Sequence, residues 1–360
     1  MANAQTLTPA QYMTLADVVK FKNPDGSILT QIIDEYSTVQ TLGAEIPAVQ
    51  ASDAMEDNGS FLEPWEYDKT SKTTDLDGGS QYFKIGTYQR KDIMGMRSSA
   101  IGINERQYLM AGEAGKFWRA QQTLARSKHI ALDKEHDMFY GDPSVDPNQN
   151  LGLAPRFCMC TDTKGIIKRG EHKGKMSPYI TIDAGGTSAK DGNLASIYIL
   201  YLSPVNGVCW LYPKDSAEYS AGLRYVKGDF MPVKELNSQG VVEVRREASD
   251  IFEVVGGIGM RSRRAGIRIA NIDVTTEEGM KKFDEALYRA FSAMPMEFRR
   301  SAKIYSPTDI TPDLKMYYRD HFTKMSYDQA KPMNLVGDFT IDGYLFREVD
   351  HLLATEDYLA

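Results

Sequence analysis

A long helical pattern between residues 113 and 139 constrains the fold of this chain more than any other feature of its sequence. Apolar side chains recur there at the spacing of one helix face. The members of this stripe are Phe117, Ala120, Leu124, Ala131 and Met138. At about 1.5 Å per residue the helix is roughly 40 Å long, which is long for a globular domain. Gly141 follows as a suitable C-terminal stop, so the pattern predicts a rigid strut.

The chain from residue 137 to residue 157 reads DMFYGDPSVDPNQNLGLAPRF. We expect the helix to end at Gly141, residues 142–150 to form a polar joint, and residues 151–157 to lead into a sheet. The stretch contains no nucleophile motif, no set of metal ligands and no phosphate-binding glycine loop. The interpretation is a structural corner rather than a catalytic loop.

Composition narrows the class of protein. The chain has 360 residues with a net charge of −7, which excludes a protein that coats nucleic acid with a basic surface. Its 3 cysteines cannot all pair, so a reducing compartment is expected. No apolar run approaches the ~18 residues of a membrane span, and the N-terminus does not resemble a signal peptide.

The segment from residue 52 to residue 82 is acidic and aromatic at once. It is too polar to form a core, yet it holds more large aromatics than a plain linker. An extended loop that docks on a neighbour explains both properties, and a solvated acidic surface loop is the alternative that this segment leaves open. The aromatic candidates for such a contact are Phe61, Trp65, Tyr67 and Tyr82.

The second half of the chain mixes strands and helices, which predicts an α+β fold. Residues 195–202 and 208–212 carry a hairpin signal, and the strand pattern continues at 241–246, 251–255 and 265–272. Thr275 with Glu278 resembles a capping box that opens a helix closed by Pro295. Further elements are expected as a strand at 303–305, a helix from Thr311 and strands at 339–349.

Motifs that suggest chemistry are weak throughout the sequence. DAGGTS at 183–188 resembles the phosphate-binding loop of sugar kinases, but it lies mid-chain with no second motif, so a surface turn is favoured. GGIG at 256–259 lacks the third glycine of a dinucleotide loop, and a tight turn is expected there. Cys158 and Cys160 lack a second close ligand pair, and free thiols are favoured. We therefore predict no catalytic, cofactor-binding or metal-ligating residues.

The order of these features resembles that of a tailed-phage major capsid protein with the Hong Kong 97-type capsid fold, of a podovirus-type subgroup. The matching stretches begin with the long helix that ends in FYG at 139–141 and with GLAPRF at 152–157. Others are TLADVV at 14–19, NPDG at 23–26, SIYI at 196–199, LYPK at 211–214, AGL at 221–223, RIANID at 268–273, IDGY at 341–344 and DHLLATE at 350–356.

This resemblance implies a division of the chain into four parts. Residues 1–51 would be an N-terminal arm, and residues 52–104 an extended loop that the family calls the E-loop. Residues 105–275 would be a peripheral domain with a spine helix at 105–140, and residues 276–360 mainly an axial domain. Because strand-rich sequence precedes the expected helix–strand–helix unit, we also expect a permuted connectivity.

The resemblance implies a self-assembling shell protein and not an enzyme. Copies of the chain would form the pentamers and hexamers of an icosahedral virion capsid, assembled in the host cytoplasm around double-stranded DNA without sequence-specific binding. A separate scaffolding protein, a portal and a cementing protein would be partners, and no membrane or covalent cross-link is expected. The alternatives are an encapsulin-like compartment and, in a different class, a sugar-kinase-like ATP-dependent enzyme.

Overall fold

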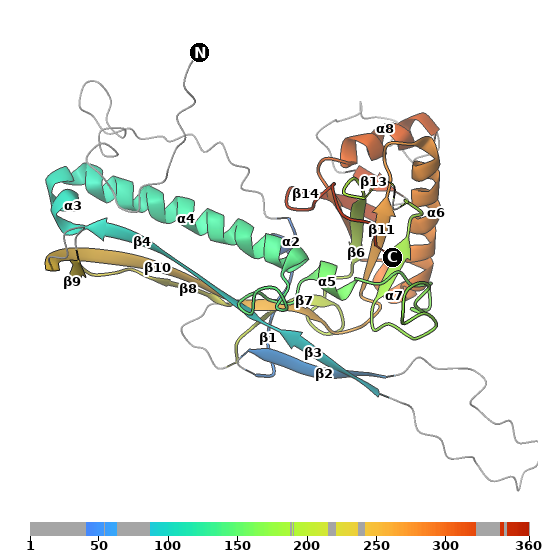
Figure 1. The fold of residues 1–360 in the computed structure, drawn as a ribbon, viewed down its shortest axis with the longest axis horizontal. Coiled ribbons are helices and arrows are strands. Elements are labelled where there is room, and N and C mark those ends of the chain that lie inside the picture. Colours follow the sequence, from blue (N-terminus) through green and yellow to red (C-terminus); the bar gives the residue numbers. More distant parts are fainter. Residues whose placement is uncertain are drawn as a thin grey trace, which may run out of the picture. The chain divides into compact units, whose positions relative to one another are not determined.

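The computed structural model describes residues 41–53, 55–62, 87–187, 189, 191–214, 221–236, 242–321, 339–341 and 344–359. They fall in two units (Figure 1). Unit 1 holds residues 96–135 and the described part of 217–255, and unit 2 holds residues 41–95, 136–216 and 256–360 where they are described. The first 40 residues of the expected arm lie outside the described residues, whereas α2 (Leu42–Glu45) and β1 (Ala48–Gln50) follow them.

The predicted long helix is confirmed as α4 (Glu113–Tyr140), which has 28 residues. It is preceded by α3 (Glu105–Ala111), whose N-cap Asn104 accepts hydrogen bonds from two backbone N–H groups of the first turn. Gly112 separates the two helices with a φ of 56°, a left-handed conformation that interrupts the helix and that glycine adopts without steric cost. The strut is therefore a single long helix with a short helix before it.

In unit 1, α3 and α4 accompany a set of strands built around a long one. β10 (Val242–Met260) has 19 residues and pairs with β9 (Met231–Leu236) and then with β8 (Leu223–Val226), both antiparallel. β4 (Gly95–Asn104) is its neighbour in the same sheet. The two strands expected at 241–246 and 251–255 are thus one continuous strand, because no turn residue separates them and β9 and β8 pair with it in succession.

The predicted apolar stripe of α4 is wrong in part. Leu124 is 52% exposed and Ala120 is exposed as well. The buried apolar cluster of unit 1 contains instead Ile103, Ala114, Trp118 and Ala248. Two registers of apolar residues run along this helix, and the one with tryptophan packs inward because it buries the larger apolar area.

Unit 2 is built on a six-stranded sheet with α6 (Glu277–Ala293) packed against β11 and β5. The strand order is β13-β14-β12-β6-β11-β5. These strands are β5 (Ile180–Asp183), β6 (Ala195–Leu200), β11 (Gly266–Ile272), β12 (Lys303–Pro307), β13 (Phe339–Ile341) and β14 (Tyr344–Val349). α7 (Met296–Arg299) and α8 (Thr311–His321) complete this part, so the helices and strands expected after residue 265 are confirmed.

The predicted hairpin at 195–212 is wrong. β6 lies between β12 and β11, whereas β7 (Val208–Tyr212) pairs in parallel with β1 and antiparallel with β10. Only one isolated bridge, between Leu202 and Val208, joins the two segments. All six residues of β6 are buried, and such a strand requires a neighbour on each edge, which a hairpin at the margin of a sheet does not provide.

The glycines at 256–259 lie inside β10. The tight turn expected there is therefore wrong. A Cβ placed on Gly256 would lie 2.3 Å from the ring atom Cζ2 of Trp210, and one on Gly259 would meet Leu211 at 2.8 Å. Glycine is required here because a large buried indole crosses the strand. The glycines thus make room for a side chain on β7.

Two local details concern helix ends. The N-cap of α6 is Thr276, whose hydroxyl accepts from the N–H of Gly279 at 3.1 Å, and not Thr275, which donates to Asp273 instead. The expected stop at Gly141 is confirmed, since its N–H donates to the Asp137 carbonyl at 3.0 Å and α4 ends one residue earlier. The corner is closed by the N–H of Gly152, which donates to the Gly141 carbonyl at 2.8 Å.

The end of the described chain is fastened to the sheet of unit 2. Glu356 forms an antiparallel bridge with Leu194, and its carboxylate pairs with Arg268 of β11 at 2.8 Å. The Asn271 amide group both donates to the Leu359 carbonyl and accepts from its N–H, each at 2.8 Å. Residues 356–359 are therefore held against β6 and β11 by side-chain contacts and one isolated bridge.

The expected boundary between residues 275 and 276 does not separate two sheets. β6, from the segment assigned to the peripheral domain, pairs antiparallel with β12, from the segment assigned to the axial domain. The assignment of particular residues to these two domains stays a prediction and is taken up again below.

Candidate functional site: the ionic network at the base of the β2–β3 hairpin

Of the four aromatic residues predicted to contact a neighbouring subunit, the structure describes the backbone of one, Phe61. Trp65, Tyr67 and Tyr82 lie outside the described residues. The backbone of Phe61 lies in β2 (Glu56–Leu62), where it is the partner of Tyr88 in β3 (Thr87–Ile93). Their role in contacts therefore stays a prediction, and the described site is the hairpin that carries the segment between them.

The β2–β3 hairpin places two carboxylates opposite each other. Asp57 is the direct partner of Asp92, and Gly59 is the partner of Arg90. Residues that face each other across an antiparallel pair share a face, so this face of the hairpin is charged and yet buried. Two like charges at directly opposed positions destabilise a sheet unless cations neutralise them.

Arg156 supplies the first of these cations from α5 (Leu153–Arg156). Its side chain is 0% exposed and pairs with the equally buried Asp92 carboxylate. The same guanidinium donates to the Ile258 carbonyl at 2.6 Å, to the Leu151 carbonyl at 3.2 Å and to the Tyr179 hydroxyl at 3.1 Å. Burial by itself lowers the pKa of Arg156, but Asp92 and Tyr179 more than reverse this and hold the pKa above its ordinary value.

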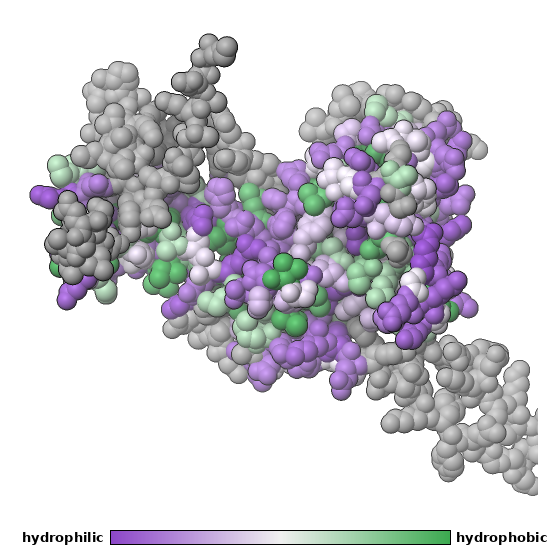
Figure 2. All heavy atoms as spheres, in the orientation of Figure 1, coloured by the Kyte–Doolittle hydropathy of each residue, from purple (hydrophilic) through white to green (hydrophobic). Residues whose placement is uncertain are grey.

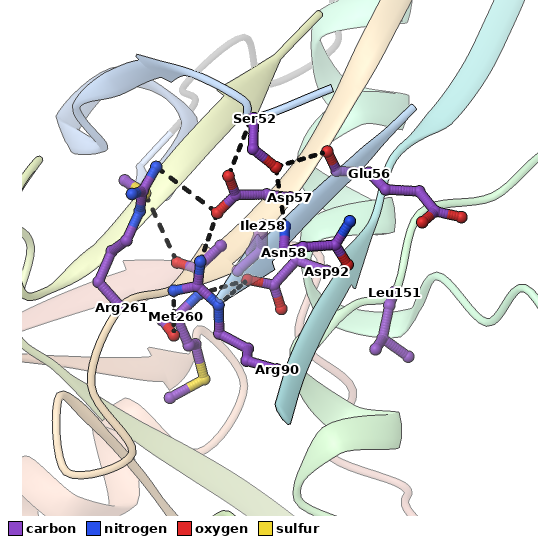
Figure 3. A network of polar contacts seen from close by, with 12 residues as sticks. Ser52, Glu56, Asp57, Asn58, Arg90, Asp92, Leu151, Ile258, Met260 and Arg261 are labelled. Carbon is purple, nitrogen blue, oxygen red and sulfur yellow. Dashed lines mark hydrogen bonds and ion pairs between the residues drawn. The ribbon is translucent and has the colours of Figure 1, made fainter. Parts of the chain in front are cut away.

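Arg90 and Arg261 complete the network from β3 and from the residue after β10 (Figure 3). Arg90 reaches Asp57 at 2.5 Å and Asp92 at 3.3 Å, and it donates to the Met260 carbonyl at 3.0 Å. Arg261 lies 3.5 Å from the same Asp57 oxygen that Arg90 contacts. Gly59 leaves room for Arg90 to cross the hairpin, because a Cβ there would lie 2.9 Å from its Nη2.

The network contains Arg90, Arg156, Arg261 and the two carboxylates, and it joins the hairpin to α5 and β10. Three cations face two carboxylates, and the remaining guanidinium donors are directed at backbone carbonyls. Arginine suits such a site because its planar fork makes several directed hydrogen bonds at once. The arrangement holds the hairpin in place, and its charged groups face each other rather than a substrate.

Sequence reasoning missed this network, although a signal was present. Arg90 and Asp92 are two residues apart in a strand and thus share a face, and Asp57 lies in the strand before them. A strand with charges of both signs at alternate positions indicates an internal ionic ladder when its other face is also polar. Arg156 gave no such signal, since its helix has only four residues.

The motifs considered for chemistry are engaged in the fold. The Asp183 carboxylate pairs with Arg169 at 3.0 Å and accepts from the N–H of Gly185 at 2.9 Å. Burial raises the pKa of the Cys160 thiol to about 11, so it is protonated at neutral pH. Within the described ranges the cysteines are free, and those residues contain no group of three or more potential metal ligands. No described helix is long and apolar enough to span a bilayer.

Comparison with solved structures identifies the fold. The structure of bacteriophage epsilon15 is similar to this chain with a TM-score of 0.65 at 17% identity, over 99% of each chain. For the bacteriophage JBD30 capsid the TM-score is 0.49 at 13% identity, over 84% of this chain and 90% of that one. For an encapsulin complex of Synechococcus elongatus the TM-score is 0.38 at 12% identity, over 73% of this chain and 98% of that one. The chain has the Hong Kong 97-type capsid fold.

Fold and sequence family together define a major capsid protein of a tailed bacteriophage, a structural component of the virion shell and not an enzyme. The family model described as "Major capsid protein GP7" matches residues 69–360, and the chain belongs to this family. No curated protein matches the chain in sequence. The kinase alternative drawn from residues 183–188 is thereby excluded.

Proposed function

We propose that copies of this chain form the pentamers and hexamers of an icosahedral shell, with residues 63–86 reaching from each hairpin to a neighbouring subunit. Phe61, Trp65, Tyr67 and Tyr82 are the docking groups, because aromatic side chains bury a large area at a small entropy cost. The observation that carries the proposal is the ionic network at the base of the hairpin. It anchors both strands of the hairpin, and with them the two ends of residues 63–86, to α5 and β10.

The proposal includes a revised division of the chain. Unit 1, with α4 and the strands β4, β8, β9 and β10, corresponds to the peripheral domain. The axial domain takes the sheet from β13 to β5, so it begins before residue 276 and includes β5, β6 and β11. The permuted connectivity, expected from the order of strand-rich sequence before the helix–strand–helix unit, stays a prediction beside this division.

The remaining partners follow from the resemblance alone. A separate scaffolding protein, a portal and a cementing protein take part in building the shell, and assembly takes place in the host cytoplasm. The shell encloses double-stranded DNA without reading its sequence. No covalent cross-link joins the subunits, so virion protein boiled in denaturant is expected to run as a monomer.

Electron microscopy of the purified protein and of the virion tests the proposal. Closed icosahedral particles with five-fold and six-fold rings are expected, and virions should show density for the chain around DNA. Particles that instead enclose a protein cargo would favour an encapsulin-like compartment. A protein that stays monomeric at every concentration and ionic strength, with or without virion extract, would refute the assembly.

A further inference from the structure

The loop between α5 and β5 carries an exceptional concentration of cations for a chain with a net charge of −7. Residues 164–175, which we name the basic loop, contain Lys164, Lys168, Arg169, Lys173 and Lys175 against the single acid Glu171, hence 5 − 1 = +4. All five cationic side chains are exposed. Figure 1 shows the loop in green beside the label α7, and Figure 2 shows strongly hydrophilic spheres in that part of the view.

The basic loop has a defined backbone. Antiparallel bridges join Thr161 to Ile167 and Ile166 to Met176, and the N–H of Ile167 donates to the Lys175 carbonyl at 2.9 Å. Beneath it, the buried Arg263 donates to the carbonyl of Lys164 at 3.2 Å and to that of Ser177 at 3.1 Å. The fold thus presents the lysines in fixed positions and adds a further cation below them.

Only a small part of this positive charge is neutralised within unit 2. Arg169 pairs with Asp183 at 3.0 Å, and the Asp162 carboxylate accepts from the backbone N–H groups of residues 164 and 166. Among the described residues, none forms an ion pair with the side chains of Lys164, Lys168, Lys173 or Lys175. Cations held close together repel one another, so the loop is matched to an anionic partner that is not part of its own surface.

We propose that the basic loop receives the acidic segment 63–77 of a neighbouring copy of this chain. The segment carries Glu63, Glu66, Asp68, Asp75 and Asp77 against Lys69 and Lys72, hence 2 − 5 = −3. It complements the +4 of the loop, and it directly follows β2 in the chain. This inference rests on the proposed function, because only a shell of repeated copies brings the two segments together.

Aromatic chemistry distinguishes this partner from nucleic acid. Trp65 and Tyr67 alternate with the acids of the segment, and aromatic rings stack favourably on lysine and arginine side chains. Ile166, which is 36% exposed near the start of the basic loop, offers an apolar contact. The phosphate backbone of a DNA duplex would gain nothing from that isoleucine or from a site suited to aromatic rings.

Charge reversal and charge exchange test the pairing. Lys173→Glu with Lys175→Glu should lower the yield of assembled particles at low salt by roughly tenfold or more, since like charges at an interface slow association and suppress binding. Adding Asp75→Lys with Asp77→Lys should restore the yield. The matched control, Lys214→Glu with Lys227→Glu, changes the same number of exposed lysines elsewhere and should assemble as the wild type does.

Zero-length carbodiimide cross-linking of assembled particles gives a second, independent readout. Amide bonds between lysines of residues 164–175 and carboxylates of residues 63–77 are expected. In particles built from mixed isotopically labelled and unlabelled chains, these bonds should join chains of different label. Cross-links confined to single chains, or bonds from the loop only to other segments, would overturn the inference.

The outcomes separate this inference from the proposed function. If the wild type forms no particles, the proposed assembly fails. If the wild type and the loop variant assemble equally well, the assembly stands and the inference is wrong. A variant that assembles normally but retains less DNA would assign the loop to nucleic acid and would equally refute the contact between copies.

Discussion

Unit 1 and unit 2 each bury an arginine–aspartate pair, but the two sites differ in how many elements they join. In unit 1, Arg119 of α4 makes a two-pronged contact with Asp250 of β10, at 2.8 Å and 2.5 Å, and donates to the Gly228 carbonyl at 2.9 Å. The hydrogen bond from Arg119 to Asp250 is the main cause of its raised pKa. This pair fastens one helix to one strand.

In unit 2, the base of the β2–β3 hairpin uses Asp92 for two arginines at once. Arg156 comes from α5 and Arg90 from β3, and the Met260 N–H of β10 also donates to this carboxylate, at 3.3 Å. Loss of the Asp92 carboxylate removes one partner from each of two buried arginines, although Arg90 keeps Asp57 and both keep backbone carbonyls. Loss of Asp250 removes the carboxylate of one arginine, which keeps the Gly228 carbonyl. The comparison indicates that one carboxylate, Asp92, stabilises the attachment of the hairpin through two arginines at once.

The largest effect is expected from Asp92→Asn. Because Arg156 and Arg90 would be left buried with an incomplete set of acceptors, the free energy of unfolding should fall by about 3–5 kcal/mol. Urea unfolding of the unassembled subunit, followed by tryptophan fluorescence, measures this loss. A loss below about 1 kcal/mol would mean that the remaining partners, with Asp57 for Arg90 and the carbonyls and Tyr179 hydroxyl for Arg156, satisfy both guanidinium groups.

Asp250→Asn should cost less, about 2 kcal/mol, because Arg119 retains the Gly228 carbonyl and its packing over the Phe230 ring. The same urea titration compares the two variants directly. If Asp250→Asn proves more destabilising than Asp92→Asn, the proposed difference between a carboxylate that pairs with two arginines and one that pairs with a single arginine is wrong.

Lys134 on α4 is a cation that the fold destabilises, and its pKa predicts a pH dependence of the free energy of unfolding. Burial lowers the pKa of Lys134 on α4 to about 8, although Glu135 acts in the opposite direction. Between pH 8 and the ordinary value of 10.5 the unfolded chain keeps this proton and the folded chain has lost it, so stability rises with pH across this window. Relative to Lys134→Met, the wild type should gain at most about 3 kcal/mol over that range. A flat difference between the two proteins would contradict the shift.

The smallest effect is expected at the outer face of the same hairpin. Lys91 pairs with Glu56 at 2.7 Å, but both side chains are largely exposed. Solvent and salt screen such a pair, so Lys91→Ala should change the free energy of unfolding by less than about 0.5 kcal/mol. This variant serves as the matched control for Asp92→Asn, because the two residues are neighbours on opposite faces of β3.

Local pattern predicted the long elements of this chain well and their pairing poorly. α4 and α6 were visible because helical spacing and end signals such as Gly141 are local properties. The partner of β6 was not visible, because β12 and β11 lie far from it in sequence and a fully buried strand has no alternating pattern. The glycines at 256–259 were misread as a turn for the same reason, since Trp210 lies on another strand.

The ionic network shows a different limit. Asp57, Arg90 and Asp92 occur among many charged residues, and charge in a polar segment usually indicates solvent exposure. Their burial depends on Arg156 and on the carbonyls of β10, which three-dimensional structure alone brings to the hairpin. The sequence predicts a contact segment in this region, which stays a prediction, and gives no signal for the burial of the anchor at the base of the hairpin.

The fastening of residues 356–359 has a consequence for synthesis. The Glu356 carboxylate accepts from the Ser196 hydroxyl, a partner 160 residues earlier in the chain. While a ribosome is still translating that interval, β6 and β11 lack the hydrogen bonds that Glu356 and Leu359 make with them. These contacts therefore form late in synthesis, after both strands have themselves been made.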